Sequence, residues 1–566
     1  MKHKFTKMYA TLLALAMGCS VFAGCGGGGT TSGNGGNESN SSVGQNSITE
    51  GKTPILISCY GGGFGTDWLV TMLNKYNESL DGDYQFVKIQ DSMEEISTTT
   101  QKIINGVGGA DIFIRDESDL MTLKASGKLL DLSSVWTATP DSANPERAIK
   151  DKFYNVDILE TAWTHNGAQY AIPYTMGTSG IVYDHDLFKQ KGWLKKDQST
   201  ESGLSKGKDG IEGNYDDGLP ETLQEYGALL GKIKDAGMWP YIIYDGISSA
   251  GTSHILNSVW AQYEGVDSYR TAFSYEGNLY KPSTGESVEI TPETGYKVYT
   301  EGEGKEKAID FLNEYVFYAG YNKTDAYCKP EKGASHTEAE SKFIYSYDEK
   351  ARIAMTINGC WWENEARVTF DTHSNRTRNP KVAYGKRDFR FMPLPYIEGQ
   401  KMPKDEAVFA VNTFGSIFAV KSTDTAKNEA ILDFLKYFAS DEGLMEFTKV
   451  SGIMPAYNFD IDAETLKTLT PFARNYYEIV HSDKVHIVCP ELYTYLSPLN
   501  YVSTNAPEPW HFSIDKIEYS NVYAVYRAKN VNTQEEVLSW AEKIKTALRA
   551  EHNATSWQTL YNEVNG

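Results

Sequence analysis

The sequence predicts an α/β fold, and three observations support this fold class. Short apolar strands alternate with amphipathic helices from residue 55 onward, an order that builds a parallel sheet with right-handed crossovers. Forty per cent of the 566 residues are hydrophobic and 37 are tyrosine, which indicates a well-packed globular protein rich in aromatic surface. The chain shows no internal repeat and no heptad pattern. Residues 53–566 are long enough for two or three domains.

The first folded residues establish the alternation. Residues 55–59 predict a buried strand, and the glycine-rich turn at 61–65 leads into a helix with Thr66 as its expected N-cap. The apolar positions of this helix have helical spacing and are Trp68, Leu69, Met72, Leu73 and Tyr76. Strands are predicted next at 84–89 and 110–114, and helices at 95–105 and 118–126, the last ending at Gly127.

The glycine cluster at 61–65 does not match a nucleotide-binding loop. The pattern G-x-G-x-x-G requires glycine where the chain has Thr66 or Trp68, and no lysine follows in P-loop register. We interpret the cluster as a tight turn that directs backbone N–H groups at a cleft.

The rest of the chain alternates in a similar way. A second region runs from residue 172 to about 395 and contains an insertion, 195–220, rich in Gly, Lys and Asp. Helices are predicted at 426–439, 443–448, 535–550 and 555–564.

The N-terminus predicts export. Three lysines, at positions 2, 4 and 7, precede an apolar stretch at 9–22 that is too short for a membrane span. The tetrapeptide Phe22-Ala23-Gly24-Cys25 resembles the bacterial lipobox, in which the cysteine receives a lipid. We therefore expect a signal peptide at 1–24 and an anchor at Cys25 on the outer face of the cell membrane. The alternative is an ordinary signal peptide with a chance cysteine.

Residues 26–51 contain almost no large apolar side chain, so burial cannot offset the entropy of ordering them. We expect residues 25–52 to be the lipid anchor and a flexible linker with a reach of roughly 25–30 Å.

Charge and cysteine content exclude several functions. The formal net charge is −21, and removal of the signal lysines makes it more negative by three. This charge argues against nucleic acid or an anionic membrane face as ligand. The four cysteines beyond the anchor are Cys59, Cys328, Cys360 and Cys489, which lack CxxC spacing. Zinc is therefore not expected, whereas one or two disulfides remain open in an exported protein.

Five segments, read together, carry a resemblance to a known family. They lie at 110–114, 171–183, 354–363 (Ala-Met-Thr-Ile-Asn-Gly-Cys-Trp-Trp-Glu), 414–420 and 430–455. Their order and spacing resemble extracytoplasmic solute-binding protein family 1, the maltose-binding type of lipoprotein that feeds bacterial ABC sugar importers.

The resemblance implies an α/β, two-lobed periplasmic-binding-protein-like fold with an interlobe ligand cleft and hinge crossings. Lobe one would comprise residues 53–174 plus 405–455, and lobe two residues 175–404 plus 456–566. Closure around a ligand would be a hinge motion. The implied function is that of a monomeric, lipid-anchored extracellular protein, not an enzyme. It would capture a carbohydrate, namely an oligosaccharide, and deliver it to the membrane subunits of an ABC importer.

The best aromatic candidates for such a ligand are Trp361 and Trp362, with Glu363 beside them for hydroxyl groups. An aromatic plane covers the C–H face of a sugar, and charged or amide groups bind its hydroxyl rim. The resemblance places Trp361 in the cleft. The alternative is a tryptophan pair packed in the core at a strand–helix turn.

Further ligand-binding candidates are distributed along the chain. They are Phe64, Asp67, Arg115 and Asp116 in lobe one, Tyr174 and Met176 on the first crossing, Trp239, Tyr244 and Asp245 in lobe two, and Trp510 in a proline-flanked loop. Arg115 stands where the family often has a sugar-stacking tryptophan. Core packing or a solvated helix cap remains the alternative for these positions.

The insertion also suggests a cation site. Calcium requires six or more oxygens from clustered carboxylates on a turning backbone, and Asp209, Asn214, Asp216 and Asp217 could supply several. EF-hand spacing fails, because position twelve is Pro220. Two interpretations remain open, a structural calcium ion or an acidic hairpin in water. No other cofactor is required.

Two other functions remain as alternatives. A surface-tethered glycan-active enzyme would need a carboxylate pair in one cleft, and the sequence shows neither HExxH nor G-x-S-x-G. The same fold could instead bind a peptide or another polar solute, since Arg115 suits a carboxylate. The strong negative charge and the tryptophan pair favour neutral sugars.

Overall fold

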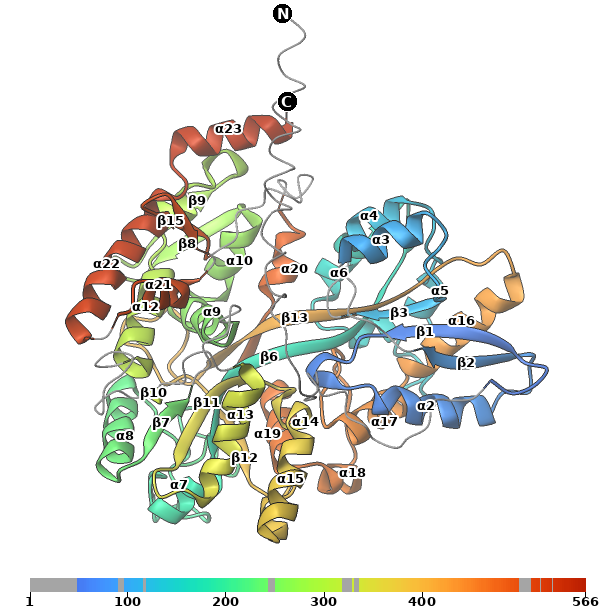
Figure 1. The fold of residues 1–566 in the computed structure, drawn as a ribbon. Coiled ribbons are helices and arrows are strands. Elements are labelled where there is room, and N and C mark those ends of the chain that lie inside the picture. Colours follow the sequence, from blue (N-terminus) through green and yellow to red (C-terminus); the bar gives the residue numbers. More distant parts are fainter. Residues whose placement is uncertain are drawn as a thin grey trace, which may run out of the picture. The chain divides into compact units, whose positions relative to one another are not determined.

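Two long antiparallel strands organise the fold. The computed structural model describes residues 48–89, 96–115, 119–242, 250–317, 328–329, 335–497, 510–519, 521–531 and 533–565. Strands β6 (Ile172–Asp184) and β13 (Ala407–Ala419) each contain 13 residues and lie side by side (Figure 1). They occupy the middle of a ten-stranded sheet with the order β10-β7-β11-β6-β13-β3-β1-β2, in which β12 also pairs with β6 and β14 with β13.

At one end of the sheet lie the first strands of the chain, β1 (Thr53–Cys59), β2 (Tyr84–Ile89) and β3 (Ile112–Arg115). β1 pairs in parallel with both β2 and β3. The helices between them are α2 (Asp67–Glu78) and α3 (Ile96–Ile104), so the predicted strand–helix alternation and parallel pairing are confirmed.

Helix α2 shows why the sequence pattern was informative. All five apolar positions predicted for it, Trp68 to Tyr76 at helical spacing, are buried. They face helices α16 (Thr425–Phe438) and α17 (Asp441–Ser451), with the Trp68 ring 4.9 Å from Phe447. Thr66 does occupy the N-cap position, but its side chain makes no capping hydrogen bond.

The long strands join two groups of elements because each has different partners along its length. The last residues of β13 pair with β3, whereas its first residues pair with β14 (Val485–Val488). The second half of β6 pairs with β11 (Ile353–Gly359) and β12 (Phe389–Met392). A third crossing follows α17, where Pro455 bridges Thr175 and the Ala456 N–H donates to the Tyr174 carbonyl over 3.1 Å.

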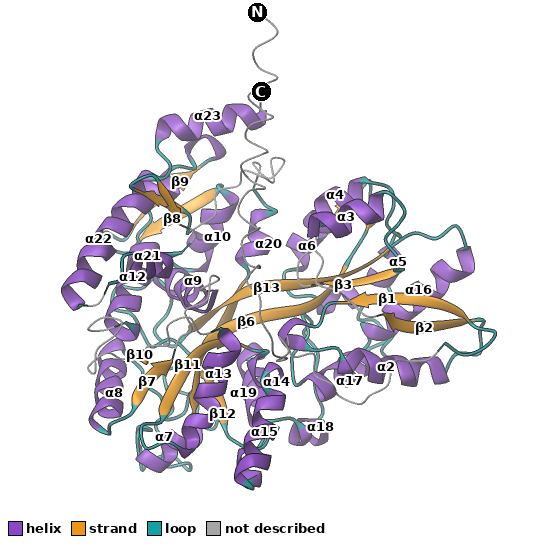
Figure 2. Ribbon diagram, viewed as in Figure 1, coloured by secondary structure: helices purple, strands orange, loops and turns teal. Residues whose placement is uncertain are grey.

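The strands are flanked by helices at both ends of β6 and β13 (Figure 2). The other elements that precede β6 in the chain are η1 (Gly62–Phe64), α4 (Leu120–Ala125), α5 (Ser133–Trp136), η2 (Ile149–Lys152), α6 (Val156–Trp163), β4 (Thr164–His165) and β5 (Ala168–Gln169).

The other elements that follow β6 in the chain are more numerous. Up to residue 329 they are α7 (His185–Lys191), α8 (Leu223–Asp235), β7 (Trp239–Ile242), α9 (Ala250–Glu264), α10 (Val266–Ser274), β8 (Gly277–Lys281), β9 (Glu286–Ile290), η3 (Pro292–Thr294), α11 (Lys297–Glu301), α12 (Gly304–Phe311), η4 (Leu312–Val316) and β10 (Cys328–Lys329). After it they are α13 (His336–Tyr345), η5 (Ser346–Asp348), α14 (Trp362–Glu365), α15 (Arg367–Thr377), η6 (Pro380–Val382), α18 (Ala463–Thr468), α19 (Pro471–Val480), α20 (Pro490–Thr494), β15 (Phe512–Ile514), β16 (Ile517–Tyr519), α21 (Val522–Ala528), α22 (Gln534–Ala550) and α23 (Ala554–Asn565).

Cys59, Cys360 and Cys489 are buried, and among the described residues no disulfide joins any of them to another. The residue boundaries given above for the two lobes stay a prediction, and the names lobe one and lobe two refer below to these predicted ranges. The signal peptide and Cys25 lie outside the described residues.

Candidate functional site

The candidate site forms where strand β11 ends beside the crossing strand β6. β11 pairs antiparallel with β6, with Gly359 opposite Ser179. The next residue continues the pairing, since the Cys360 N–H donates to the Thr178 carbonyl over 2.8 Å. Trp361 follows as the N-cap residue of α14. The sequence Asn-Gly-Cys-Trp therefore ends a strand and places one indole ring at the junction of the lobes.

Three glycines pack directly against the Trp361 ring. A Cβ atom on Gly63, Gly177 or Gly359 would overlap the indole. These glycines come from η1 of lobe one, from the crossing strand and from β11 of lobe two. Trp361 is half-buried, so part of its ring keeps a surface while the rest is held by backbone from both lobes.

Phe64 and Tyr174 support this ring from behind. The Phe64 ring lies edge-on to Trp361, 5.6 Å between centroids, and 6.1 Å from Tyr174. Phe64 is 3% exposed, and Tyr174 and Met176 are 0% and 1% exposed. Of these four predicted residues, Trp361 alone keeps more than a trace of surface. Phe64, Tyr174 and Met176 belong to the layer beneath it.

The two tryptophans of the predicted pair have different surroundings. Trp362 is fully buried in an aromatic cluster of lobe two, with the Phe389 ring 4.9 Å away and Phe343, Phe370 and Phe472 around it. Consecutive side chains at a helix start point in different directions, which explains the division. The structure therefore separates a packing tryptophan from one at the lobe junction.

Glu363 is also buried. Its Oε2 accepts a hydrogen bond from the Thr470 hydroxyl over 2.5 Å, and its Oε1 has no partner among the described residues. Burial raises the pKa of Glu363 to about 7, against the opposing effect of the Thr470 hydrogen bond. The predicted hydroxyl-binding carboxylate thus bonds the N-cap of α19 instead of lying on an open surface.

A second group of carboxylates, which sequence reasoning missed, lies one turn from Trp361. Asn358 donates to Glu340 over 2.8 Å, and His336 lies 3.3 Å from Glu365. Burial, and then the neighbouring Glu365, raise the pKa of Glu340 well above its usual range. The Glu365 N–H donates to the Trp361 carbonyl. Their separation in sequence, on α13, β11 and α14, hides this cluster from any local motif.

Direct contacts between the lobes were likewise missed. The Asn364 side chain donates to the carbonyls of Gly63, over 3.1 Å, and of Phe64, over 2.9 Å. Arg367 donates to the Val450 carbonyl over 3.0 Å and to the Asn364 side chain over 2.9 Å. The spacing of three places Asn364 and Arg367 on one helical face, the only signal that the sequence offers.

In lobe one, Arg115 turns toward its own sheet. Its guanidinium donates to the Ser58 carbonyl over 3.1 Å, to the Ser58 hydroxyl over 2.6 Å and to the Ile114 carbonyl over 3.0 Å. Asp67 is half-buried in the first turn of α2. Asp116 lies outside the described residues.

The other predicted aromatic residues occupy separate environments in lobe two. Trp239 is half-buried at the start of β7, with the Lys234 ammonium 4.2 Å above its ring. Trp510 is 6% exposed and donates its indole N–H to Asn257 over 2.8 Å. Tyr244 and Asp245 lie outside the described residues.

The Asp-rich insertion folds into a tight buried turn. Asp216 accepts hydrogen bonds from the N–H groups of Lys208 and Asp209, and Asp217 accepts one from Gly213. Asn214 donates to Asp209 over 2.6 Å. The Oδ1 atoms of Asp216 and Asp217 are buried and have no hydrogen-bond partner in the part of the chain that the structure describes. Burial, and then the neighbouring Asp209, raise the pKa of Asp216 to about 7.

The Oδ1 atoms of Asp216 and Asp217 are thus available to a cation. Asp209 and Asn214 are instead joined to each other by a hydrogen bond. Among the residues that the structure describes, no group of three or more His, Cys, Asp and Glu side chains is arranged to hold a metal ion.

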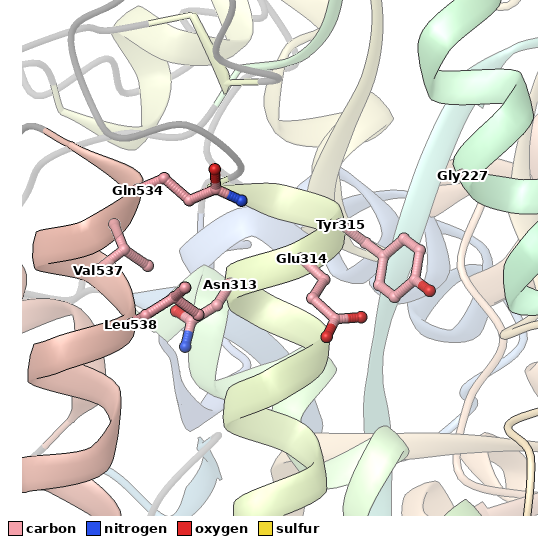
Figure 3. A pocket seen from close by; sticks show the side chains of 7 residues that line it. All are labelled: Gly227, Asn313, Glu314, Tyr315, Gln534, Val537 and Leu538. Carbon is pink, nitrogen blue, oxygen red and sulfur yellow. The ribbon is translucent and has the colours of Figure 1, made fainter.

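A separate surface hollow lies between α8, η4 and α22 (Figure 3). It is lined by Gly227, Asn313, Glu314, Tyr315, Gln534, Val537 and Leu538, none of which the sequence predicts to bind ligand. In the described part of the chain, no helix is both long enough and apolar enough to cross a membrane.

Comparison with known proteins gives a consistent result. The apo form of RafE from Streptococcus pneumoniae has a TM-score of 0.51 at 14% identity, covering 91% of this chain and 100% of that chain. The solute receptor AcbH, described as preferring β-D-galactopyranose, has a TM-score of 0.51 at 13% identity, with 88% and 98% covered. A probable secreted solute-binding lipoprotein from Streptomyces coelicolor has a TM-score of 0.50 at 11% identity, also with 88% and 98% covered. No curated protein sequence matches the chain.

These neighbours share the two-lobed periplasmic solute-binding fold, which confirms the predicted fold class. The family model of bacterial extracellular solute-binding proteins matches residues 71–458, more than half of the chain. The match begins in α2 and ends just after the third crossing, so it includes both long strands and Trp361. The chain therefore belongs to the bacterial extracellular solute-binding proteins.

Proposed function

We propose that this protein is a lipid-anchored extracellular receptor that captures a carbohydrate, namely an oligosaccharide, between its two lobes and delivers it to an ABC importer. The observation that carries the proposal is Trp361, a half-buried indole held by three glycines from both lobes. A flat aromatic face at a lobe junction suits the C–H face of a pyranose ring.

Polar groups near Trp361 supply the rest of what a sugar requires. Glu365 lies one helical turn from Trp361 and forms a cluster with His336, Glu340 and Asn358. Carboxylates and amides make strong hydrogen bonds to hydroxyl groups when water is excluded. Among the neighbours of the fold, AcbH is described as binding β-D-galactopyranose, which agrees with a sugar but does not identify the one bound here.

A hinge motion would couple binding to delivery. Asn364 and Arg367 join lobe two to the η1 turn and to α17 of lobe one. A ligand that contacts both lobes shifts the population toward the closed form by its difference in affinity for the two forms. The importer would recognise that closed form.

Anchoring is the part of the proposal that rests on sequence. The Phe22-Ala23-Gly24-Cys25 tetrapeptide resembles a lipobox, and the residues after Cys25 suit a flexible tether. One lipid chain binds a membrane only reversibly, so durable anchoring would need more than one chain on the cysteine.

The alternative of a peptide or another anionic solute is weakened by Arg115. Both of its terminal nitrogens donate to Ser58 or Ile114 of the same sheet. To bind a ligand carboxylate, the Arg115 guanidinium would have to give up these hydrogen bonds, which lowers the gain from binding an anion. A surface enzyme would act through a carboxylate pair facing one another in the cleft, whereas Glu340 and Glu365 share one cluster with His336.

The Asp-rich insertion supports a further part of the proposal, a structural calcium ion. Asp216 and Asp217 would each offer a buried oxygen that has no partner. Asp209 and Asn214 would contribute oxygens after exchanging their mutual hydrogen bond for the ion. The ion would neutralise three buried carboxylates and so stabilise the turn.

The experiment that tests the binding function is a thermal-shift and calorimetric panel of oligosaccharides varied in linkage and length, with peptides included. A ligand that binds only the folded state raises its melting temperature by mass action. Micromolar binding of one glycan series would support the receptor function. A response to peptides alone would change the cargo, and product formation from a bound glycan would indicate an enzyme.

A further inference from the structure

A basic cavity in lobe two has no role in the proposed sugar site. Its volume is about 620 Å³, and it lies among α7, η5, β11 and η6. It is lined by Asp186, Gln190, Tyr347, Arg352, Pro380, Lys381, Lys386 and Arg387. Four of these eight residues are cationic in a chain with a net charge of −21. Such a concentration of positive charge on an acidic protein requires an explanation.

Two arginines form the wall of this cavity, and they share one carboxylate. The Nη2 atoms of Arg352 and Arg387 each lie 2.6 Å from the same oxygen of Asp184. Asp184 is fully buried and Arg387 is 3% exposed. One carboxylate cannot neutralise two guanidinium groups, so the pair keeps one positive charge in a desolvated place.

The arginines also retain unused hydrogen-bond donors. Arg387 donates from Nη1 to the Ile344 carbonyl over 3.1 Å, and Arg352 from Nη1 to Gln190 over 3.4 Å. A guanidinium carries five N–H donors. The Nε atoms of both arginines are buried without a partner among the described residues. Buried donors that lack a partner cost free energy, and the arginines would recover part of this cost by turning these N–H groups toward an anion in the cavity.

Tyr347 and two lysines complete the cavity. The Tyr347 ring lies 4.8 Å from the Arg352 guanidinium carbon and 5.1 Å from that of Arg387, so it holds both groups in place. Lys381 and Lys386 are exposed. Planar, held guanidinium groups recognise anionic oxygens with directed hydrogen bonds, and mobile lysines add charge at the edge.

The charge of the cavity selects the ligand. The four cations stand against two carboxylates, Asp184 behind the wall and Asp186 on it, which leaves two positive charges. Asp186 is already engaged, since its Oδ2 accepts the Asp388 N–H over 3.0 Å. A phosphate group carries about −1.5 to −2 charges at pH 7, which matches this balance. A single carboxylate would leave one positive charge unmatched.

We propose that the cavity bounded by Arg352, Arg387, Lys381 and Lys386 is a phosphate-binding site. The phosphate could come from a free small molecule or from the headgroup of an anionic lipid, since both present the same oxygens to the arginines. The site is independent of Trp361 and of the cargo, so it stands whether or not the protein binds sugar.

The test compares sodium phosphate with sodium chloride at matched ionic strength, by melting temperature and by calorimetric titration. The variant K381Q/K386Q removes two exposed cations and leaves the buried arginine pair in place. Its control is K128Q/K421Q, which removes two exposed lysines from neighbouring chain segments of lobe one. We expect phosphate to raise the melting temperature, and K381Q/K386Q to weaken its affinity roughly tenfold. The control should bind like the parent protein.

A second arm distinguishes the sources by co-sedimentation with phosphatidylglycerol or phosphatidylcholine vesicles. Binding to phosphatidylglycerol alone, lost in K381Q/K386Q but kept in the control, would assign the site to a lipid headgroup. Binding of free phosphate with no preference between vesicles would assign it to a small molecule. The proposal is overturned if neither phosphate nor vesicles produce an effect beyond that of salt, or if the control pair weakens binding equally.

Discussion

The adjacent residues Trp361 and Trp362 allow a stringent test of the site. Trp361 is half-buried at the lobe junction, whereas Trp362 is fully buried in the core of lobe two. We predict that Trp361→Ala weakens binding of the cognate sugar by at least tenfold and costs less stability than Trp362→Ala. Trp362→Ala should instead destabilise the fold by about 3–5 kcal/mol, the usual cost of removing a large core side chain.

The size of the binding effect follows from the exposed ring. A tryptophan buries about 150–250 Å² when covered, so the exposed minority of a half-buried one offers a ligand at most about 90 Å². At about 25 cal/mol per Å² this surface is worth up to roughly 2 kcal/mol. Ordering costs on association consume part of that value. A tenfold loss of affinity corresponds to about 1.4 kcal/mol and lies within this range.

Calorimetry with the first glycan found in the panel measures the affinity, and denaturant unfolding measures stability. Trp362→Phe, which keeps an aromatic ring in the core, is the matched control and should bind within about twofold of the parent. The reasoning is refuted if Trp361→Ala binds with unchanged affinity, or if Trp362→Phe loses as much affinity as Trp361→Ala while remaining folded.

Three further predictions test other parts of the molecule. Asn364→Ala should lower ligand affinity about fivefold and favour the open form, because it removes two hydrogen bonds between the lobes; small-angle scattering with and without ligand would show it. Glu363 has a folded-state pKa of about 7, above its unfolded value, so its contribution to stability is complete below about pH 4.5 and is lost as pH rises through 7; urea unfolding at pH 5.5 and 8 should show this fall, and Glu363→Gln should reduce it. Calcium chloride should raise the melting temperature of chelator-treated protein, and Asp217→Asn should abolish the rise.

Each of these predictions has its own control. The control for Asn364→Ala is Arg376→Ala, which changes an exposed residue near the end of α15 and should leave ligand affinity unchanged. If the free energy of unfolding falls equally between pH 5.5 and 8 in Glu363→Gln and in the parent protein, Glu363 is not the cause of the fall. Asp197→Asn changes an aspartate of the same insertion that lies outside the buried turn and should keep the calcium response. Magnesium producing the same rise as calcium would contradict a calcium-selective site.

The local pattern predicted the first part of the fold well, because its determinants are close in sequence. The helix of Trp68 and Tyr76 was recognisable since its buried face repeats every three to four residues. The predicted strand at 84–89 coincides with β2, because apolar residues between turn signals leave little alternative. Helix α17 is longer than predicted at both ends, since Ser440 caps it and Gly452, at φ +72°, ends it.

The site was only partly predictable. The Asn-Gly-Cys-Trp-Trp segment pointed to the turn between β11 and α14, but periodicity cannot say which tryptophan faces the core. Glu340, Glu365 and His336 come together through the pairing of β11 with β6 and the packing of α13, which no short motif encodes. Arg115 was predicted to meet a ligand, and sequence could not show that its guanidinium donates to Ser58 of β1 and to Ile114 of β3.

The sequence by itself determined the alternation of strands and helices and the segments that resemble a solute-binding family, and it predicts an export signal with Cys25. These properties depend on neighbouring residues, so a linear pattern carries them. Tertiary structure alone decided that glycines 63, 177 and 359 share one indole ring, and that Arg352 and Arg387 share Asp184. Those groups are separated by up to about three hundred residues, and only the folded backbone brings their atoms within contact.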